Sequence, residues 1–387
     1  MAEKKKQHYV PKFYMRMFLF DNTSFYLYNL SSKKNIGLVP YKSQCYKNFF
    51  YGQNVILENK LSALELKWRD AMLAFLDHNY SKGTIKLLKE FSLYQLRRTT
   101  NFYNQEKKAH QKLIQEYIET HLAGKNQLSA SNIEMAKNIS IEKADAMISP
   151  EIILDTVDNL LEQIEDLAFL HIHFKTNKKL ISSDNPILPL NQYIQNNRGV
   201  GIIGYAMLFT ISPTDACLFY DAKFYPKYAN KYYVELNDQS IVNHINALLY
   251  ATAEEIIYSS EPIDNTILSS NNNILRKQNS ETNNVSNIGI PTNKMIVINN
   301  CAVYNHFNFI FLKIRDEFSK IKKCFRTPVP RIYDHGYDEK LLHEYTLLPD
   351  ILSLNKTNQI NDKYISDYKK SHEKYHHLIK KYWKDEL

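Results

Sequence analysis

Apolar residues recur at intervals of three and four along four stretches of the chain, and this spacing predicts amphipathic helices. The stretches cover residues 56–78, about 85–104, about 151–171 and 238–258. The third follows a proline and carries acidic residues in its early turns, which is typical of a helix start. A more polar stretch, about 105–121, predicts a helix that lies at the surface.

Shorter apolar runs between turn-forming residues predict strands. Residues 13–51 predict a hairpin or small sheet, in which FYMRMFLF and FYLYNL are strands separated by the turn DNTS. Residues 179–190 predict a strand, a turn closed by Pro186 and a second strand, and residues 199–220 predict two strands around a Ser-Pro turn. Together these elements predict an α+β fold with a small N-terminal β-sheet or hairpin, a helical layer, central antiparallel strands and a C-terminal helical extension.

The composition changes after residue 260. Residues 261–300 hold 11 Asn with many Ser and Thr and show no period, which predicts a linker or long loop. The predicted domains are therefore a core over 1–260 and an extension over 301–387. A final helix, about 361–384, places one apolar stripe that we expect to dock on the core: Tyr364, Tyr368, Tyr375, Leu378 and Tyr382.

The composition bounds the class of protein but names no activity. Hydrophobic residues make up 44% of the 387 residues, which excludes a wholly disordered or disulfide-dense chain. The net charge of +8 is compatible with a nucleic-acid partner, and five cations in residues 320–331 are either a phosphate-binding surface or a solvated face. Four scattered cysteines, no signal peptide and no apolar run of membrane-spanning length predict a cytoplasmic protein with no membrane partner.

Two segments place chemically useful side chains among apolar ones. His8 precedes an aromatic run that is expected to pack against it. It is either a general base or ligand held by these aromatic side chains, or a histidine whose ring nitrogens bond backbone groups. Asp184 and Asn185 lie where a predicted strand meets a turn, a place that favours catalytic groups. Their side chains equally suit capping of the local backbone.

These segments resemble a known family. HYVP followed by FYMRMF, and SSDNPI, are similar to the two signature motifs of domain of unknown function 4238, a set of mostly bacterial proteins with some viral members. Three further segments are similar to a family helix with Gln and then Arg-Thr, a Ser-Pro strand pair and a closing Asn-rich helix: residues 90–100, 208–220 and 241–260. The resemblance covers about residues 6–260. It implies no activity, because the family's function is unknown.

Carrying the family pattern over singles out six residues: His8, Gln95, Arg98, Asp184, Asn185 and Asn243. Where the family has Thr-Pro after its Arg, this chain has Thr99-Thr100. The set suits phosphodiester cleavage, with His8 as base, Arg98 on the phosphate and Asp184 orienting His8 or binding a divalent metal such as Mg²⁺. Gln95, Asn185 and Asn243 would then place the substrate.

The leading hypothesis is therefore a nuclease, with RNA favoured over DNA, and by analogy a bacterial toxin or anti-phage effector. The first alternative is a non-catalytic binding module, which predicts a buried His8 with both nitrogens bonded and no open cleft beside Asp184. The second is an enzyme on a small nucleotide, which predicts a deep apolar pocket walled by Tyr9 and Phe13. A protein partner or homo-oligomer, the metal and any other cofactor stay open.

Other pairs of polar residues favour structural roles. Glu58 and Glu65 share a face of an amphipathic helix and are expected to be exposed. His171 and His173 form HxH at a predicted helix end, where alternate residues point apart and cannot share a metal, although on a strand they could.

Overall fold

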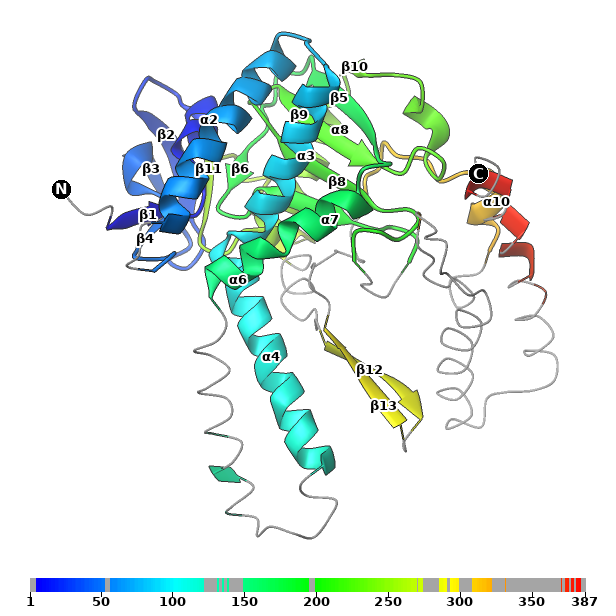
Figure 1. Cartoon of the computed structure of the whole chain (residues 1–387). Helices are drawn as coiled ribbons and strands as arrows, with labels where there is room; N and C mark the ends of the chain where they lie inside the picture. Colours follow the sequence, from blue (N-terminus) through cyan, green and yellow to red (C-terminus); the bar gives the residue numbers. More distant parts are fainter. Residues whose placement is uncertain are drawn as a thin grey trace.

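The computed structural model describes residues 5–52, 56–121, 149–194, 199–269, 285–290, 293–298 and 308–321, with shorter pieces elsewhere. Its elements form an α+β fold, which confirms the predicted class (Figure 1). Within this described part, none of the helices combines the length and the apolar character that crossing a bilayer requires.

A five-stranded sheet forms the centre of the molecule, with strand order β10–β5–β9–β8–β7. The strands are β5 (Ala168–Phe174), β7 (Ile187–Leu190), β8 (Ala206–Thr210), β9 (Asp215–Tyr220) and β10 (Tyr233–Leu236). The pairs are antiparallel except for β5 and β10, which run parallel. Nearly all residues of β7, β8 and β9 are buried on both faces, which explains why these strands show continuous apolar runs rather than alternation.

Helices cover both faces of this sheet (Figure 1). On one face α2 (Ile56–Leu76), α3 (Lys82–Arg97) and α7 (Val157–Gln163) pack against side chains such as Phe169. On the other face α8 (Gln239–Thr252) packs against the next side chain along, Leu170, and its alternating companions. The period of two along each strand thus divides the core into two apolar layers.

The N-terminal region forms smaller sheets. β2 (Ser24–Asn29) and β3 (Lys34–Pro40) form the predicted hairpin, and the sheet continues through β11 (Ile256–Ser259) to β6 (Ser182–Ser183). β1 (Lys6–His8) pairs with β4 (Tyr46–Asn48). The prediction of a strand over FYMRMF is wrong: α1 (Lys12–Met15) and a single 3-10 turn form there. Tyr14, Met15 and Phe18 are fully buried at helical spacing, and this burial selects the helix.

Three predicted helices also end earlier than expected. The helix predicted over 238–258 is α8, which ends at Thr252, and residues 256–259 form β11. Instead of one helix over 85–104, α3 ends at Arg97 and α4 (Thr100–His121) begins anew. The predicted helix over 151–171 is α6 (Pro150–Asp155) and α7, and the following residues form β5. AFLHIHF has apolar side chains on both faces of a covered strand, so its pattern does not distinguish strand from helix.

Described parts of the C-terminal region pack on the core. Tyr375 and Leu378 are buried in the same apolar cluster as α8, which confirms docking of the tyrosine stripe for these residues; Tyr364 and Tyr368 lie outside the described residues. A hairpin of β12 (Val285–Ile290) and β13 (Asn293–Ile298) falls inside the stretch predicted to be a linker or loop.

Arg331 does not belong to a phosphate-binding surface. Its guanidinium is buried and donates to the Asp166 carboxylate and to the carbonyls of Gln163, Val200 and Ile202. A buried cation with these partners anchors its segment to the core. α10 (Asp316–Ser319) lies in the same region and buries Phe318 against the core.

Candidate functional site

The HYVP segment is held by the end of α3. Arg98 Nη2 donates to the carbonyl of His8 at 2.8 Å, and Gln95 Nε2 donates to the carbonyl of Tyr9 at 3.0 Å. Arg98 Nε also donates to the hydroxyl of Tyr51 at 3.0 Å. The structure therefore brings three of the predicted residues together, but Gln95 and Arg98 bind the chain itself. Pairing of this kind is what buried polar groups require.

The charge of Arg98 is balanced by an acid from α2. Arg98 Nη2 lies 2.8 Å from Glu65 Oε1, and the Arg98 side chain is 1% exposed while that of Glu65 is 26% exposed. Glu65 was expected on an exposed helical face, and instead it is half-buried. Because a buried cation without a partner is costly, Glu65 is the group that lets Arg98 reach the HYVP backbone.

His8 is buried at the end of β1. Its Nε2 lies 3.2 Å from the carbonyl of Lys42, and a carbonyl only accepts, so Nε2 carries the proton. Burial, with Lys12 nearby, lowers the pKa of His8 to about 4. The ring is therefore neutral near pH 7 and is a weak base. Among the described residues, Nδ1 has no hydrogen-bond partner, so the binding-module prediction of two bonded nitrogens is met for one of them.

Asp184 and Asn185 hold a second stretch of backbone, the junction between α8 and β11. The Asp184 carboxylate accepts from the amides of Glu254 at 2.9 Å, Glu255 at 2.6 Å and Ile256 at 3.1 Å. Asn185 Nδ2 donates to the carbonyl of Thr252 at 3.1 Å. Burial raises the pKa of Asp184 to about 7, although the three amide donors oppose the shift.

The third predicted segment contributes a different asparagine. Asn243 is exposed on α8. Asn246, one turn later, is buried; it accepts from the amide of Ile181 at 3.0 Å and donates to the carbonyl of Lys179 at 2.9 Å. Asn246 thereby fixes the segment that leads into SSDNPI. Residues three apart lie on nearly the same face of a helix, so the helical period alone does not separate these two asparagines; packing in the tertiary structure does.

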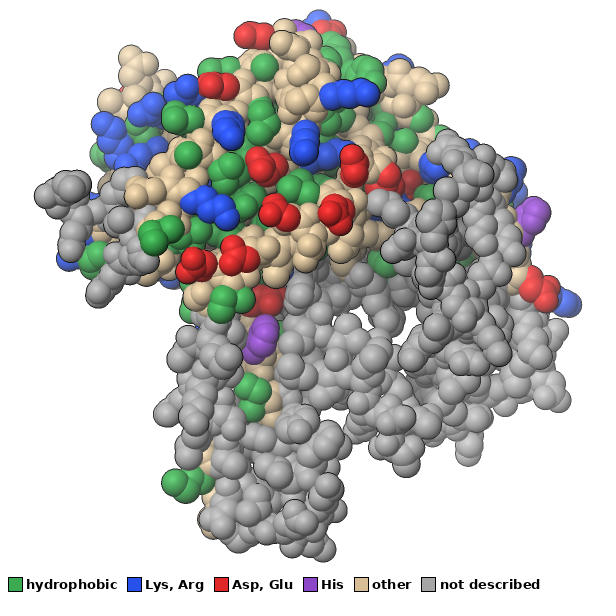
Figure 2. Space-filling view, in the orientation of Figure 1, with side chains coloured by type: hydrophobic (Ala, Val, Ile, Leu, Met, Phe, Trp, Pro, Cys, Tyr) green, Lys and Arg blue, Asp and Glu red, His purple; other side chains and the backbone are tan. Residues whose placement is uncertain are grey.

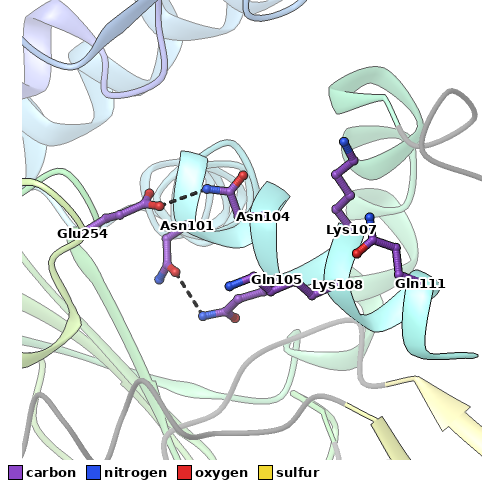
Figure 3. Close-up of a pocket in the computed structure, with 7 residues that line it drawn as sticks. All are labelled: Asn101, Asn104, Gln105, Lys107, Lys108, Gln111 and Glu254. Atoms are coloured by element: carbon purple, nitrogen blue, oxygen red, sulfur yellow. Dashed lines mark hydrogen bonds between the residues drawn. The ribbon is translucent and has the colours of Figure 1, made fainter. Parts of the chain in front are cut away.

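The two groups of motif residues meet at a polar pocket (Figure 3). Asp184 fixes the amide of Glu254, and the Glu254 carboxylate accepts from the Thr100 hydroxyl and from Asn104 Nδ2. Thr100 begins α4 two residues after Arg98. The pocket holds about 310 Å³ and is lined by Asn101, Asn104, Gln105, Lys107, Lys108, Gln111 and Glu254. It combines one carboxylate, two ammonium groups and four amides.

The sequence did not mark Glu254 as a candidate site residue, although its position near a helix end was unusual for an acid. Glu254 and Glu255 are adjacent acids near the end of the apolar helix predicted over 238–258, in the segment that resembles the family's closing helix. Two acids at a helix end oppose the helix dipole, and this is a reason to suspect another role. That the Glu254 side chain faces α4 follows only from the tertiary structure.

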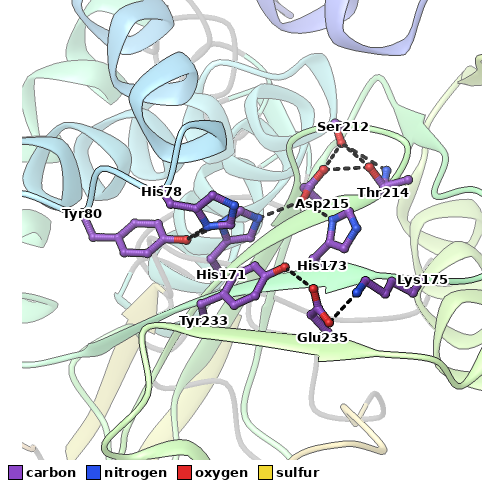
Figure 4. A network of polar contacts seen from close by, with 10 residues as sticks. All are labelled: His78, Tyr80, His171, His173, Lys175, Ser212, Thr214, Asp215, Tyr233 and Glu235. Atoms are coloured by element: carbon purple, nitrogen blue, oxygen red, sulfur yellow. Dashed lines mark hydrogen bonds and ion pairs between the residues drawn. The ribbon is translucent and has the colours of Figure 1, made fainter.

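A cluster of histidines forms a separate polar network at the central sheet (Figure 4). His171 and His173 lie on β5, not at a helix end, so both face the same side and both contact Asp215 Oδ1 at 2.8 Å. The hydroxyls of Ser212 and Thr214 donate to Asp215 Oδ2 at 2.6 and 2.7 Å. Although burial opposes it, these donors hold the pKa of Asp215 well below its usual range.

The network continues from His171 toward solvent. The Tyr80 hydroxyl lies 2.7 Å from His171 Nδ1 and 2.8 Å from Nδ1 of the exposed His78. Burial lowers the pKa of His171, although Asp215 opposes the shift. A neutral His171 that donates from Nε2 to Asp215 accepts the Tyr80 proton at Nδ1, so His78 donates to Tyr80. The expectation that HxH is structural stays a prediction, but its placement at a helix end is wrong.

No group of three His, Cys, Asp or Glu side chains within the described residues is arranged to bind a metal ion. Tyr9, expected to wall a nucleotide pocket, is buried in the core, where burial raises its pKa and nearby Cys45 and Asp184 add to the shift.

Comparison with known proteins identifies a family and nothing further. A family model described as "Protein of unknown function (DUF4238)" matches residues 6–262, which include all six predicted residues and Glu254. The searches of curated proteins and of solved structures both returned no match.

Proposed function

We propose that this chain, which belongs to the DUF4238 family of proteins of unknown function, cleaves phosphodiester bonds in nucleic acid, RNA in preference to DNA. One observation carries the proposal: the motif residues position Glu254 in a pocket with Lys107 and Lys108 (Figure 3). A fixed carboxylate in a pocket that is also lined by ammonium groups supplies the groups that proton abstraction next to a phosphate needs.

In this proposal Glu254 is the general base. Its carboxylate takes the proton of a ribose 2′-hydroxyl, the 2′-oxygen attacks phosphorus, and the 5′-oxygen leaves with a proton from water. Lys107 and Lys108 stabilise the negative charge that develops on the phosphate oxygens. RNA is favoured because it carries the nucleophile within the substrate. The amides of Asn101 and Gln105 suit contacts to base edges.

His8, Arg98 and Asp184 then act as positioning residues. Each bonds the backbone of its own chain, and through Asp184 and the end of α3 they set the distance between Glu254 and α4. Gln95 and Asn185 serve the same purpose. A divalent metal such as Mg²⁺ is compatible with the proposal, and the reactions with EDTA and with added metal test it. A direct role for Asn243 is tested by adding an Asn243→Ala variant to the same cleavage assay.

The test compares purified wild-type protein with Glu254→Gln and with Glu255→Gln as the matched control. Glu255 is adjacent and exposed, so its substitution removes the same charge outside the pocket. We expect wild type to cleave single-stranded RNA, and Glu254→Gln to lose about 100-fold or more, the usual contribution of a general base. The Glu255→Gln variant should keep full activity. RNA with 2′-methoxy groups and DNA of the same sequence should resist cleavage.

Two results would overturn the proposal. One is intact RNA in every wild-type reaction, with EDTA and with added Mg²⁺ or Mn²⁺. The other is equal cleavage by wild type and Glu254→Gln. If DNA and 2′-methoxy RNA are cleaved as well, the nucleophile is water and the RNA preference fails.

The second candidate function is a non-catalytic binding module. It is favoured by the backbone bonds of His8, Arg98 and Asp184, which are what packing motifs require. It predicts RNA binding without cleavage and a loss of stability in motif variants. A cytoplasmic toxin or anti-phage effector is the setting we propose for the nuclease, and loss of growth on expression, relieved by Glu254→Gln, tests it.

A further inference from the structure

The charge of the chain is concentrated at one end. Residues 1–50 contain nine Lys and Arg against two Asp and Glu, so this segment carries +7 of the net charge of +8. The remaining residues are close to neutral. An asymmetry of this kind produces a positive field over one part of the surface and is the electrostatic footprint of a polyanion partner.

The structure places these cations at the surface. All eight Lys and Arg side chains between residues 5 and 50 are exposed, and none forms an ion pair with a described residue. Figure 2 shows Lys and Arg side chains gathered at the left of this face, where Figure 1 places β2, β3 and α2. We call the exposed Lys and Arg of residues 5–48 the N-terminal basic surface.

Two of these cations lie near His8. Lys12 and Lys6 are close enough to help lower the pKa of His8, after burial. Lys47 lies on β4, opposite Gln7, and Lys42 bonds His8 through its backbone carbonyl. Arg98 bonds the backbone of the HYVP segment and so fixes the position of the strand that carries Lys6.

A hollow beside this group has the size and charge of a phosphate contact. Lys12 and Arg16 line it together with Arg69 and Ser62 from α2, and the pocket holds about 210 Å³. Glu65 also lines the hollow, but its negative charge is balanced by the guanidinium of the buried Arg98. Arg16 Nε donates to the Tyr41 hydroxyl at 2.7 Å, which holds the guanidinium in place. Preorganised guanidinium groups favour phosphate.

Aromatic rings are interleaved with the cations. The Lys6 ammonium lies 4.8 Å from the centre of the Tyr46 ring, and the Arg16 guanidinium lies 5.4 Å from that of Tyr41. Tyr41 is buried, whereas Tyr46 is partly exposed. Exposed cations beside a partly exposed ring, on which a base can stack, are an arrangement of proteins that bind single-stranded nucleic acid.

We propose that the N-terminal basic surface binds the phosphate backbone of single-stranded nucleic acid without regard to its sequence. The inference rests on the proposed function, since it names the surface along which the substrate of that nuclease lies. Binding by charge neutralisation releases counterions, so the affinity falls with salt at a slope of about 0.7 per phosphate contact for a single strand.

The test uses a labelled single-stranded RNA of about 20 nucleotides, long enough to cross several contact sites, and fluorescence anisotropy over a series of salt concentrations. All binding is measured in the Glu254→Gln background so that the RNA stays intact. The test variant carries Lys6→Gln, Lys12→Gln, Lys42→Gln and Lys47→Gln. The matched control carries Lys60→Gln, Lys67→Gln, Lys82→Gln and Lys86→Gln, four exposed lysines of α2 and α3.

We expect the test variant to lower the salt slope by up to about 3, since four contacts at about 0.7 each are removed. The control should retain the slope of the parent. Equal weakening in both variants would reduce the effect to net charge and overturn the inference, and so would unchanged binding in the test variant. Should the test variant unfold, Lys33→Gln with Lys34→Gln, at the exposed turn between β2 and β3, asks the same question with two contacts.

Two further arms separate this inference from its rivals. Vesicles of phosphatidylserine and phosphatidylcholine that bind the parent but not the test variant, without RNA binding, would assign the surface to a membrane. Wild type that binds RNA with the expected slope but cleaves none would refute the proposed function and leave this inference standing. The same four lysine substitutions placed in the wild-type chain, if they leave the KM for RNA cleavage unchanged, would refute the inference and leave the nuclease standing.

Discussion

The motif core and the histidine cluster use the same residue types in opposite ways. In the motif core, His8, Arg98 and Asp184 direct their polar atoms mainly at backbone amides and carbonyls. In the cluster, His171 and His173 direct theirs at another side chain, Asp215 (Figure 4). Side chains that bond backbone fix the path of the chain, whereas side chains that bond each other form a network with ends that reach solvent.

The difference separates a structural role from a chemical one. Removing Asp184 takes the carboxylate acceptor away from three backbone amides, so its bonds secure the fold. Removing Tyr80 disconnects two imidazoles, one of which is exposed, so its bonds govern protonation. The motif core therefore acts at a distance, by presenting Glu254 to the pocket. In the histidine cluster, by contrast, the polar side chains bond one another.

The largest expected effect is that of Asp184→Ala. It removes the carboxylate that accepts from the amides of Glu254, Glu255 and Ile256, and a buried donor left without its acceptor costs about 1–3 kcal/mol. We expect a loss of at least about 3 kcal/mol in the free energy of unfolding, measured by urea titration. Asp184→Asn keeps one acceptor oxygen and should lose less. A stable Asp184→Ala variant would show that the junction does not depend on this clamp.

The pH dependence of stability is the next test of the comparison. The pKa of His8 falls from 6.5 to about 4 on folding, so the unfolded chain binds the proton more tightly. The stability that neutral His8 contributes is fully present above pH 6.5 and is lost as the pH falls toward about 4. One such group gives a slope of at most about 1.4 kcal/mol per pH unit.

His8→Gln, which keeps a donor for the Lys42 carbonyl, should flatten the acid limb of the stability profile. The measurement is urea unfolding at a series of pH values. An acid limb that is the same in His8→Gln and wild type would place the acid sensitivity in the histidine cluster, where burial lowers the pKa of His171 as well.

The smallest expected effect is that of Tyr80→Phe, which keeps the ring and removes the hydroxyl between His78 and His171. We expect a loss of about 1 kcal/mol, the net value of a hydrogen bond. Histidine NMR titration should show a changed pKa for His171. Tyr233→Phe is the control, because its hydroxyl donates to the exposed Glu235 and not to a histidine. Identical titrations in wild type and Tyr80→Phe would contradict the relay through the hydroxyl.

The candidate site was predictable in part. The family resemblance singled out His8, Gln95, Arg98, Asp184 and Asn185, and all five are buried and bonded in the structure. Their partners were not predictable, because a backbone carbonyl leaves no mark in a sequence. Asn243 was chosen by resemblance, and its exposure shows that the buried contact belongs to Asn246. The position of Glu254 in the pocket could be recognised only from the contact between Glu254 and α4 in the tertiary structure.

The sequence by itself determined the fold class, the β2–β3 hairpin and the helical stripe of α2, because periods of two and 3.6 follow from local geometry. It also determined the family, through two short motifs. Only the tertiary structure decided that residues 168–174 are a strand, since burial on both faces removes the period that distinguishes a strand from a helix. It likewise decided that residues 12–18 form helical turns, because packing in the core buries Tyr14, Met15 and Phe18. It also decided which carboxylate stands in the pocket, because that depends on contacts between segments about 150 residues apart, over which local propensity has no influence.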